Sequence, residues 1–206
     1  MKLHTTDGLA LEAEWAEPTP ARATVVLCHP HPQYGGTMRS IVISALFEAL
    51  PSRAVACLRF NFRGVENSEG GYSEGRDEPL DIAAALDAAA AAGVAGPLVL
   101  VGWSFGADMA LGVDDPRIAA WVGIAPPLRF RSEAAYAAIG HDPRPKLLVL
   151  AAHDEFRAPA EIEAATAEWA ATRREIVAGA SHFFIGRIDR VVTLVGDFVD
   201  ALTAPA

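Results

Sequence analysis

The sequence lacks the features that mark several classes of protein. Its 206 residues include two cysteines, which are too few for a scaffold held together by disulfides. Seventeen basic residues stand against 26 acidic ones, so the formal net charge is −9. That balance argues against a nucleic acid or an anionic membrane as a partner. Residues 1–8 contain no apolar core of a signal peptide, and we therefore expect a cytoplasmic protein.

Long uninterrupted apolar runs are also missing. No charged residue falls between Asp87 and Asp108, but this stretch is rich in alanine, and two glycines and Pro97 interrupt its middle. Such a stretch would be a poor membrane span. It is better explained as the end of a helix, a turn and a buried strand. Because 51% of the residues are apolar, the chain can bury a substantial core, and we predict one domain covering residues 1–206 and no membrane partner.

Short apolar runs rich in β-formers alternate with helical patterns along the chain. Residues 2–16 predict a hairpin that turns at Asp7-Gly8. Further strands are predicted at 24–28, 54–60, 98–101, 118–124, 146–151 and 175–177. Helices are predicted at 38–50, 77–92, a short stretch from 104, 159–171 and 187–202. Continuous apolar strands between helices indicate an α/β fold with a mostly parallel sheet and helices on both faces.

The strongest chemical signal is Gly102-Trp103-Ser104-Phe105-Gly106, which matches the pattern G-x-S-x-G. A predicted strand leads directly into it and a helical stretch follows. In a sharp strand-to-helix turn the neighbouring segments pack closely around the serine, so small residues are needed two positions away on either side. A chain of this composition is expected to contain about 0.05 such matches by chance. We therefore interpret Ser104 as a nucleophile rather than as a serine in an ordinary tight turn.

A serine hydroxyl is a weak nucleophile until a base takes its proton, and an acid must orient that base. In a fold of this kind the order along the chain is serine, acid, histidine. The strand predicted at 146–151 leads into Asp154, and His182 follows the last predicted strand. We predict Asp154 as the acid and His182 as the base. Glu155 and His153 are the competing residues beside Asp154.

Backbone N–H groups are needed to stabilise the oxyanion that forms when a serine attacks a carbonyl carbon. One donor is expected from Phe105, the residue after the nucleophile. The other is expected from the loop that follows the first parallel strand. In that loop Pro30 and Pro32 have no N–H, which leaves His31 as the predicted donor and Gln33 as the alternative.

Other kinds of ligand receive little support from the sequence. His29 and His31 could suggest a metal site, but a proline follows each of them, and we predict no metal. Residues 64–71 are glycine-rich but lack the phosphate-loop pattern, and no G-x-G-x-x-G follows the first parallel strand, so no nucleotide cofactor is indicated. Arg63 could bind a substrate carboxylate, although an arginine after a strand more often pins a loop.

These residues make the chain resemble the α/β-hydrolase superfamily, and more narrowly its small bacterial members that are similar to dienelactone hydrolases and acyl peptidases. The resemblance covers nearly the whole chain and rests on residues 29–32, 35–36, 58–64, Ser68, 102–106, Asp154 and 181–184. Glu66 departs from it, because the subgroup usually has glycine there. The resemblance implies an α/β-hydrolase fold with an eight-stranded sheet, an antiparallel second strand and no cofactor.

We expect a serine hydrolase that cleaves carboxylic esters or related acyl compounds through an acyl-enzyme, with a small-molecule acyl substrate as its partner. Peptidase, thioesterase or lactone-hydrolase activity of the same fold stays open, as does a non-catalytic binding module. The oligomeric state is also open, with a homodimer as one option. Only residues 125–144 separate two of the predicted strands, which is room for a loop and one short helix. We therefore predict an open site with no cap domain.

Several aromatic or apolar residues fall on the predicted active-site side of the sheet and could form an apolar acyl pocket. They are Tyr34, Met38, Phe105, Pro127, Phe130, Phe156 and Phe183. Most aromatic residues in such positions serve ordinary packing. We select Tyr34, Phe156 and Phe183 as the predicted substrate contacts.

Overall fold

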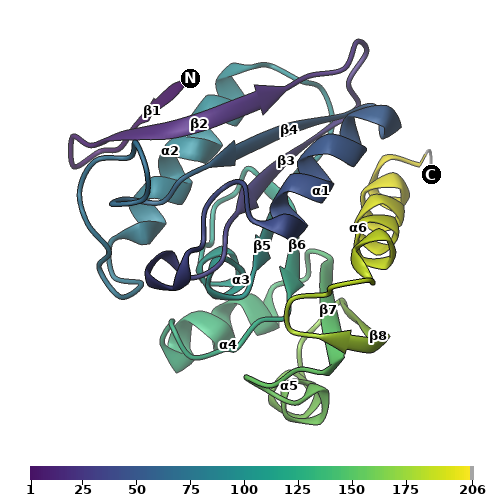
Figure 1. The fold of residues 1–206 in the computed structure, drawn as a ribbon. Coiled ribbons are helices and arrows are strands. Elements are labelled where there is room, and N and C mark those ends of the chain that lie inside the picture. The colour runs from purple at the N-terminus through teal and green to yellow at the C-terminus, as the bar shows by residue number, and fades with distance from the viewer. Residues whose placement is uncertain (205–206) are drawn as a thin grey trace.

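Eight strands form one sheet in the computed structural model, which describes residues 1–204 (Figure 1). They are β1 (Lys2–His4), β2 (Ala10–Ala16), β3 (Ala23–Cys28), β4 (Val55–Phe60), β5 (Leu98–Trp103), β6 (Ile118–Ile124), β7 (Lys146–His153) and β8 (Thr172–Ser181). Their order across the sheet is β1-β2-β4-β3-β5-β6-β7-β8. β2 pairs antiparallel with β1 and β4, and the six strands β3 to β8 are parallel to one another. The expected eight-stranded sheet with an antiparallel second strand is confirmed.

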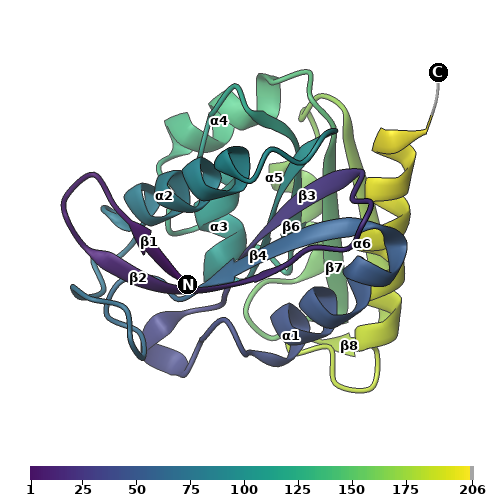
Figure 2. The ribbon, with the colours of Figure 1, turned by 90° about the horizontal axis from the view of Figure 1, so that it is seen from above.

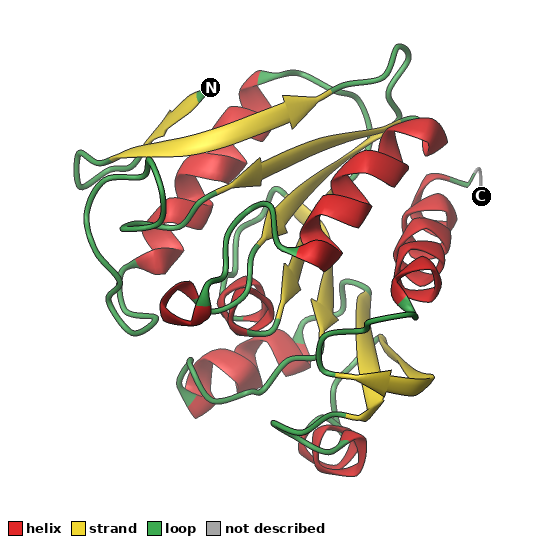
Figure 3. Cartoon of the chain, in the orientation of Figure 1, coloured by secondary structure: helices red, strands yellow, loops and turns green. Residues whose placement is uncertain are grey.

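Helices cover both faces of the sheet (Figures 2 and 3). They are α1 (Ile41–Ala49), α2 (Glu78–Ala91), α3 (Phe105–Leu111), α4 (Glu133–His141), α5 (Pro159–Ala165) and α6 (Ile188–Thr203). α1 and α6 pack on one face, and α2, α3, α4 and α5 pack on the other. Successive strand residues point to opposite faces. Val25 and Leu27 of β3 therefore join the first core, whereas Val26 and Cys28 join the second.

The connection between β6 and β7 decides whether the site is covered. It contains α4 and loops but no inserted domain, as the length of residues 125–144 predicts. The hairpin predicted within residues 2–16 is present as β1 and β2, with its turn at residues 6–8. None of the helices within residues 1–204 is long and apolar enough to cross a membrane.

The structure differs from the sequence prediction mainly at the last strand and the helix before it. The helix predicted over 159–171 ends at Ala165, because Thr166 leaves the helical conformation (φ −112°, ψ 11°). The strand predicted at 175–177 is instead the ten-residue β8. β8 lies at the edge of the sheet and most of its side chains are exposed or half-buried, so no continuous apolar run marks its ends.

The helix predicted over 38–50 begins three residues late, at Ile41. Ser40 Oγ accepts the backbone N–H of Thr37 at 3.0 Å, which closes a turn ahead of the helix. Residues 38–40 therefore lengthen the loop between β3 and α1. This loop lies at the carboxyl end of the parallel strands, where binding sites of α/β proteins form.

Candidate active site

Ser104 occupies a strained turn between β5 and α3. Its backbone has φ 55° and ψ −120°, a conformation that non-glycine residues rarely adopt. A Cβ added to Gly102 would lie 2.1 Å from the carbonyl oxygen of Gly106, and one added to Gly106 would lie 2.3 Å from that of Cys28. Both distances are far shorter than a van der Waals contact. The two glycines of the motif are therefore required by packing around the turn, as the sequence analysis argues.

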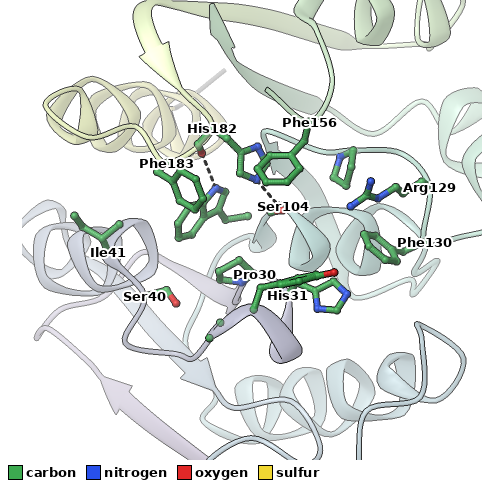
Figure 4. Close-up of a pocket in the computed structure, with 15 residues that line it drawn as sticks. Pro30, His31, Ser40, Ile41, Ser104, Arg129, Phe130, Phe156, His182 and Phe183 are labelled. Carbon is green, nitrogen blue, oxygen red and sulfur yellow. Dashed lines mark hydrogen bonds between the residues drawn. The ribbon is translucent and has the colours of Figure 1, made fainter. Parts of the chain in front are cut away.

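The structure brings Ser104, His182 and Asp154 together although they lie far apart in the sequence (Figure 4). His182 Nε2 lies 2.9 Å from Ser104 Oγ, and His182 Nδ1 lies 2.9 and 3.0 Å from the two oxygens of Asp154. An ionised carboxylate only accepts hydrogen bonds, so we assign the ring proton to Nδ1. Nε2 is then free to accept the hydroxyl proton of Ser104, which is the arrangement that activates a serine.

Asp154 and His182 each follow directly after a strand, β7 and β8 respectively. Their side chains are only 6% and 5% exposed. Asp154 Oδ1 also accepts the backbone N–H of Phe156 at 2.9 Å, so the loop after β7 fixes the carboxylate. Because both strands are longer than predicted, the two residues lie closer to the strand ends than the sequence analysis expects.

The competing residues beside Asp154 have other positions. His153 is the exposed last residue of β7. Glu155 does not contact the imidazole, but its carboxylate accepts the backbone N–H of His182 at 3.0 Å. On the other side, the indole Nε1–H of Trp103 donates to the carbonyl oxygen of His182 at 3.2 Å. Sequence reasoning missed these two contacts to the backbone of His182, since no motif links residues so far apart.

The two predicted backbone donors lie in the loop after β3 and at the start of α3. Neither the N–H of Phe105 nor that of His31 makes a hydrogen bond within residues 1–204. The N–H of Gln33 donates to His31 Nδ1 at 3.2 Å. The rings of His31 and Phe105 pack with their centroids 5.3 Å apart, so the two candidate donors belong to neighbouring segments.

His29 ties this loop to the segment after β4. Its Nε2 accepts the backbone N–H of Phe62 at 3.0 Å, and its Nδ1 lies 2.6 Å from the carbonyl oxygen of Pro30. Burial lowers the pKa of His29 to about 4, which keeps the ring neutral. Asn61 adds a second link, because its Oδ1 accepts the backbone N–H of Met38 at 2.8 Å. Protein groups engage both ring nitrogens of His29, and no cluster of three or more potential metal ligands exists within residues 1–204.

Arg63 pins the loop that follows β4. Its guanidinium, 5% exposed, lies 2.7 Å from a carboxylate oxygen of Asp81 and 2.9 Å from one of Asp7. The interpretation of Arg63 as a loop anchor is confirmed. Burial raises the pKa of Asp81 to about 6, although the hydrogen bonds from Arg63 oppose that shift. Glu66, the departure from the resemblance, adopts φ 48°, and its carboxylate accepts a hydrogen bond from Asn61 at 2.7 Å.

An open pocket of about 580 Å³ contains Ser104 and His182 (Figure 4). The predicted contacts Tyr34, Phe156 and Phe183 all line it, and each is exposed. Of the wider set of apolar residues, Pro127 and Phe130 line the pocket too. Met38 and Phe105 do not, because their side chains are fully buried in the core. The other lining residues, which were not predicted to form the pocket, include Ser40, Ile41, Trp103 and Arg129.

Comparison with known proteins agrees with this fold. The model of the alpha/beta hydrolase family matches residues 25–175. The chain belongs to the alpha/beta hydrolase family. This membership and the serine hydrolases among the similar structures support a hydrolytic activity.

Two solved structures of hydrolases superpose over almost the whole chain. An alpha-beta serine hydrolase homologue from Coxiella burnetii is 30% identical, with a TM-score of 0.86, and the match covers 97% of this chain and 96% of that one. A serine hydrolase without a lid from Xanthomonas campestris is 25% identical, with a TM-score of 0.83, over 100% and 95% of the two chains. An uncharacterized protein, RP471, from Rickettsia prowazekii (strain Madrid E) is 27% identical over 92% of this chain and 84% of its own length.

Proposed function

We propose that this hydrolase cleaves carboxylic esters or closely related acyl compounds with Ser104 as its nucleophile. The observation that carries the proposal is the continuous path of hydrogen-bonding contacts from Asp154 through His182 to Ser104 Oγ. The two contacts that join these three side chains are both 2.9 Å long, within the range required for proton transfer. The strained turn that presents Ser104 supports the same role.

The proposed reaction begins when His182 Nε2 takes the proton from Ser104 Oγ as that oxygen attacks the substrate carbonyl carbon. Asp154 holds the ring in the required tautomer and stabilises the imidazolium that forms. The carbonyl oxygen becomes an oxyanion. When the tetrahedral intermediate collapses, His182 gives its Nε2 proton to the leaving alkoxide and the acyl group stays on Ser104. Water, deprotonated by the same nitrogen, then releases the acid and restores the serine.

The backbone N–H groups of Phe105 and His31 are the proposed oxyanion donors. Both are free of partners within residues 1–204, as a donor kept for a transition state must be. The N–H of Gln33 already donates to His31 Nδ1, which favours His31 over Gln33 as the second donor. The prolines on either side of His31 restrict the backbone of this loop, so the donor is held in place before substrate binds.

The open pocket supports a preference for esters with short acyl chains. Tyr34, Phe156 and Phe183 offer exposed aromatic surface around the serine, and no domain is inserted between β6 and β7 to enclose a long acyl chain. We expect acetyl and butyryl esters to be turned over at least as well as long-chain esters. A clear preference for long acyl chains would contradict this part of the proposal.

Replacing the nucleophile tests the proposal. Ser104→Ala should reduce the hydrolysis of 4-nitrophenyl acetate by about 10⁴-fold or more, because no other group can form the acyl-enzyme. Ser52→Ala, which changes an exposed serine in the segment after α1, is the matched control and should retain wild-type turnover. Turnover by folded Ser104→Ala at the wild-type level would overturn the assignment. A wild-type protein that folds but turns over no acyl substrate would favour a non-catalytic binding module.

A further inference from the structure

Arg129 differs from every other arginine in the chain. The sequence contains fifteen arginines, and fourteen of them form an ion pair with a carboxylate or donate to a carbonyl or hydroxyl oxygen. The guanidinium of Arg129 makes neither kind of contact within residues 1–204. Both lysines also have oxygen partners. Arg129 is therefore an exposed cation without an oxygen partner in a protein with 26 acidic residues.

The backbone around Arg129 is firmly held, so the lack of an oxygen partner does not come from a loose loop. Asp108, fully buried in α3, accepts the backbone N–H groups of Leu128, Arg129 and Phe130 at 2.8, 2.8 and 3.0 Å. α3 is the helix that follows Ser104. The same short helix therefore follows the proposed nucleophile and anchors the segment that carries Arg129.

The side chain of Arg129 lines the pocket that contains Ser104 (Figure 4). It extends from its loop toward the pocket, and its guanidinium carbon lies 4.9 Å from the centre of the Phe130 ring. Among the described residues 1–204, no aspartate, glutamate or lysine lines the pocket, and Arg129 is the only arginine that does. The guanidinium lies close enough to act on the site: burial, and then the positive charge of Arg129, lower the pKa of His31.

We propose that Arg129 binds a carboxylate carried by the substrate, so that the preferred substrates are esters or related acyl compounds with one negative charge. This inference rests on the proposed serine hydrolase activity and narrows its substrate class. A guanidinium can bind a carboxylate with two parallel N–H···O bonds. Tyr34, Phe156 and Phe183 would then contact the uncharged part of the same substrate.

Two pairs of esters, each differing by one charge, test the proposal. In the first pair the acyl group carries the charge: the mono-4-nitrophenyl ester of adipic acid is compared with its methyl ester. In the second pair the leaving group carries it: 4-acetoxybenzoate is compared with methyl 4-acetoxybenzoate. For each pair we expect the wild-type protein to show a higher kcat/KM for the charged ester. Arg129→Gln should lower the ratio of charged to neutral kcat/KM by about 10-fold or more in at least one pair.

Arg173→Gln is the matched control. It removes the same unit of charge from an exposed arginine near the start of β8, at the opposite end of the strand from His182, and should keep the wild-type ratio. A ratio that Arg129→Gln leaves within two-fold of wild type in both pairs would overturn the carboxylate site while leaving the hydrolase activity intact. Failure of the folded wild-type protein to hydrolyse any of the four esters would overturn the proposed function itself, and the substrate class with it.

Discussion

The catalytic cluster (Ser104, Asp154 and His182) and the rim of the pocket (Tyr34 and Arg129) are built in opposite ways. In the cluster the polar groups have protein partners at hydrogen-bonding distance, and the backbone of His182 is held on both sides. At the rim Tyr34 is 84% exposed, and the guanidinium of Arg129 has no oxygen partner within residues 1–204. The contrast indicates that the reacting groups are positioned before substrate arrives. At the rim, Tyr34 and Arg129 remain available to contact a substrate.

If the cluster depends on these fixed partners, removing the one that orients the base should have the largest effect. Asp154→Asn should lower kcat for 4-nitrophenyl acetate by about 10⁴-fold, because an amide that donates to Nδ1 leaves the proton on Nε2, where the base must accept. Steady-state kinetics would measure the loss. Asp189→Asn, an exposed aspartate in the first turn of α6, is the control. A loss below about 10-fold would show that Asp154 does not orient His182.

His29, which ties the loop after β3 to the segment after β4, should make the stability of the folded protein depend on pH. The pKa of His29 is about 4 in the folded protein and 6.5 as its ordinary value, so between these pH values the unfolded chain binds more protons. The stabilisation by neutral His29 is complete above pH 6.5 and decreases as the pH falls toward 4, by about 3 kcal/mol in total.

Comparison with His29→Gln isolates this contribution, because glutamine does not titrate and all other groups are shared. The free energy of unfolding of wild type minus that of the variant, from urea titrations, should fall by about 3 kcal/mol between pH 7.5 and pH 4. A difference that stays constant over this range would show that His29 is not held neutral.

The contact of Glu155 with the backbone of His182 should have a smaller effect on the cluster. Glu155→Ala removes the acceptor of the His182 N–H and should lower kcat up to about 10-fold with little change in KM, since Glu155 does not line the pocket. Glu155→Gln keeps an acceptor oxygen and should restore most of kcat. Equal losses in both variants would mean that the negative charge, rather than the hydrogen bond, is what matters.

The smallest effect is expected at the rim. Tyr34→Ala should change kcat/KM for 4-nitrophenyl acetate by less than about 3-fold, because an exposed ring buries little surface against a substrate as small as an acetyl group. The same assay with butyryl esters would show whether the ring contacts a longer chain. A loss of 100-fold for the acetyl ester would show that Tyr34 acts together with the catalytic cluster, and that the rim and the cluster do not differ as described.

Local patterns in the sequence predict the parts of the molecule that depend on local chemistry. The continuous apolar strands and the G-x-S-x-G turn predict the sheet and the position of Ser104, because burial and tight packing constrain the residues themselves. The same patterns underestimate β8, whose edge position leaves charged and exposed residues such as Arg173 within a strand. A run of charged side chains looks like a loop when its partner strand is not known.

Contacts between distant segments are the part that the sequence does not reveal. Glu155 and His182 are 27 positions apart, and nothing in either segment indicates that a carboxylate accepts that N–H. The sequence does not reveal the role of Arg129 either, since its lack of an oxygen partner becomes visible only when the partners of all the other arginines are known. Sequence reasoning therefore names the reacting groups more readily than the residues that position them or select a substrate.

If Ser104 is an activated nucleophile, a reagent that modifies reactive serines should label it covalently. The folded protein is treated with a fluorophosphonate, digested and analysed by mass spectrometry for the modified peptide. We expect one phosphonyl group on Ser104, formed at neutral pH and abolished in His182→Ala, because the hydroxyl reacts only while the imidazole takes its proton. A folded wild-type protein that remains unlabelled, or a label on another residue with Ser104 unmodified, would contradict it.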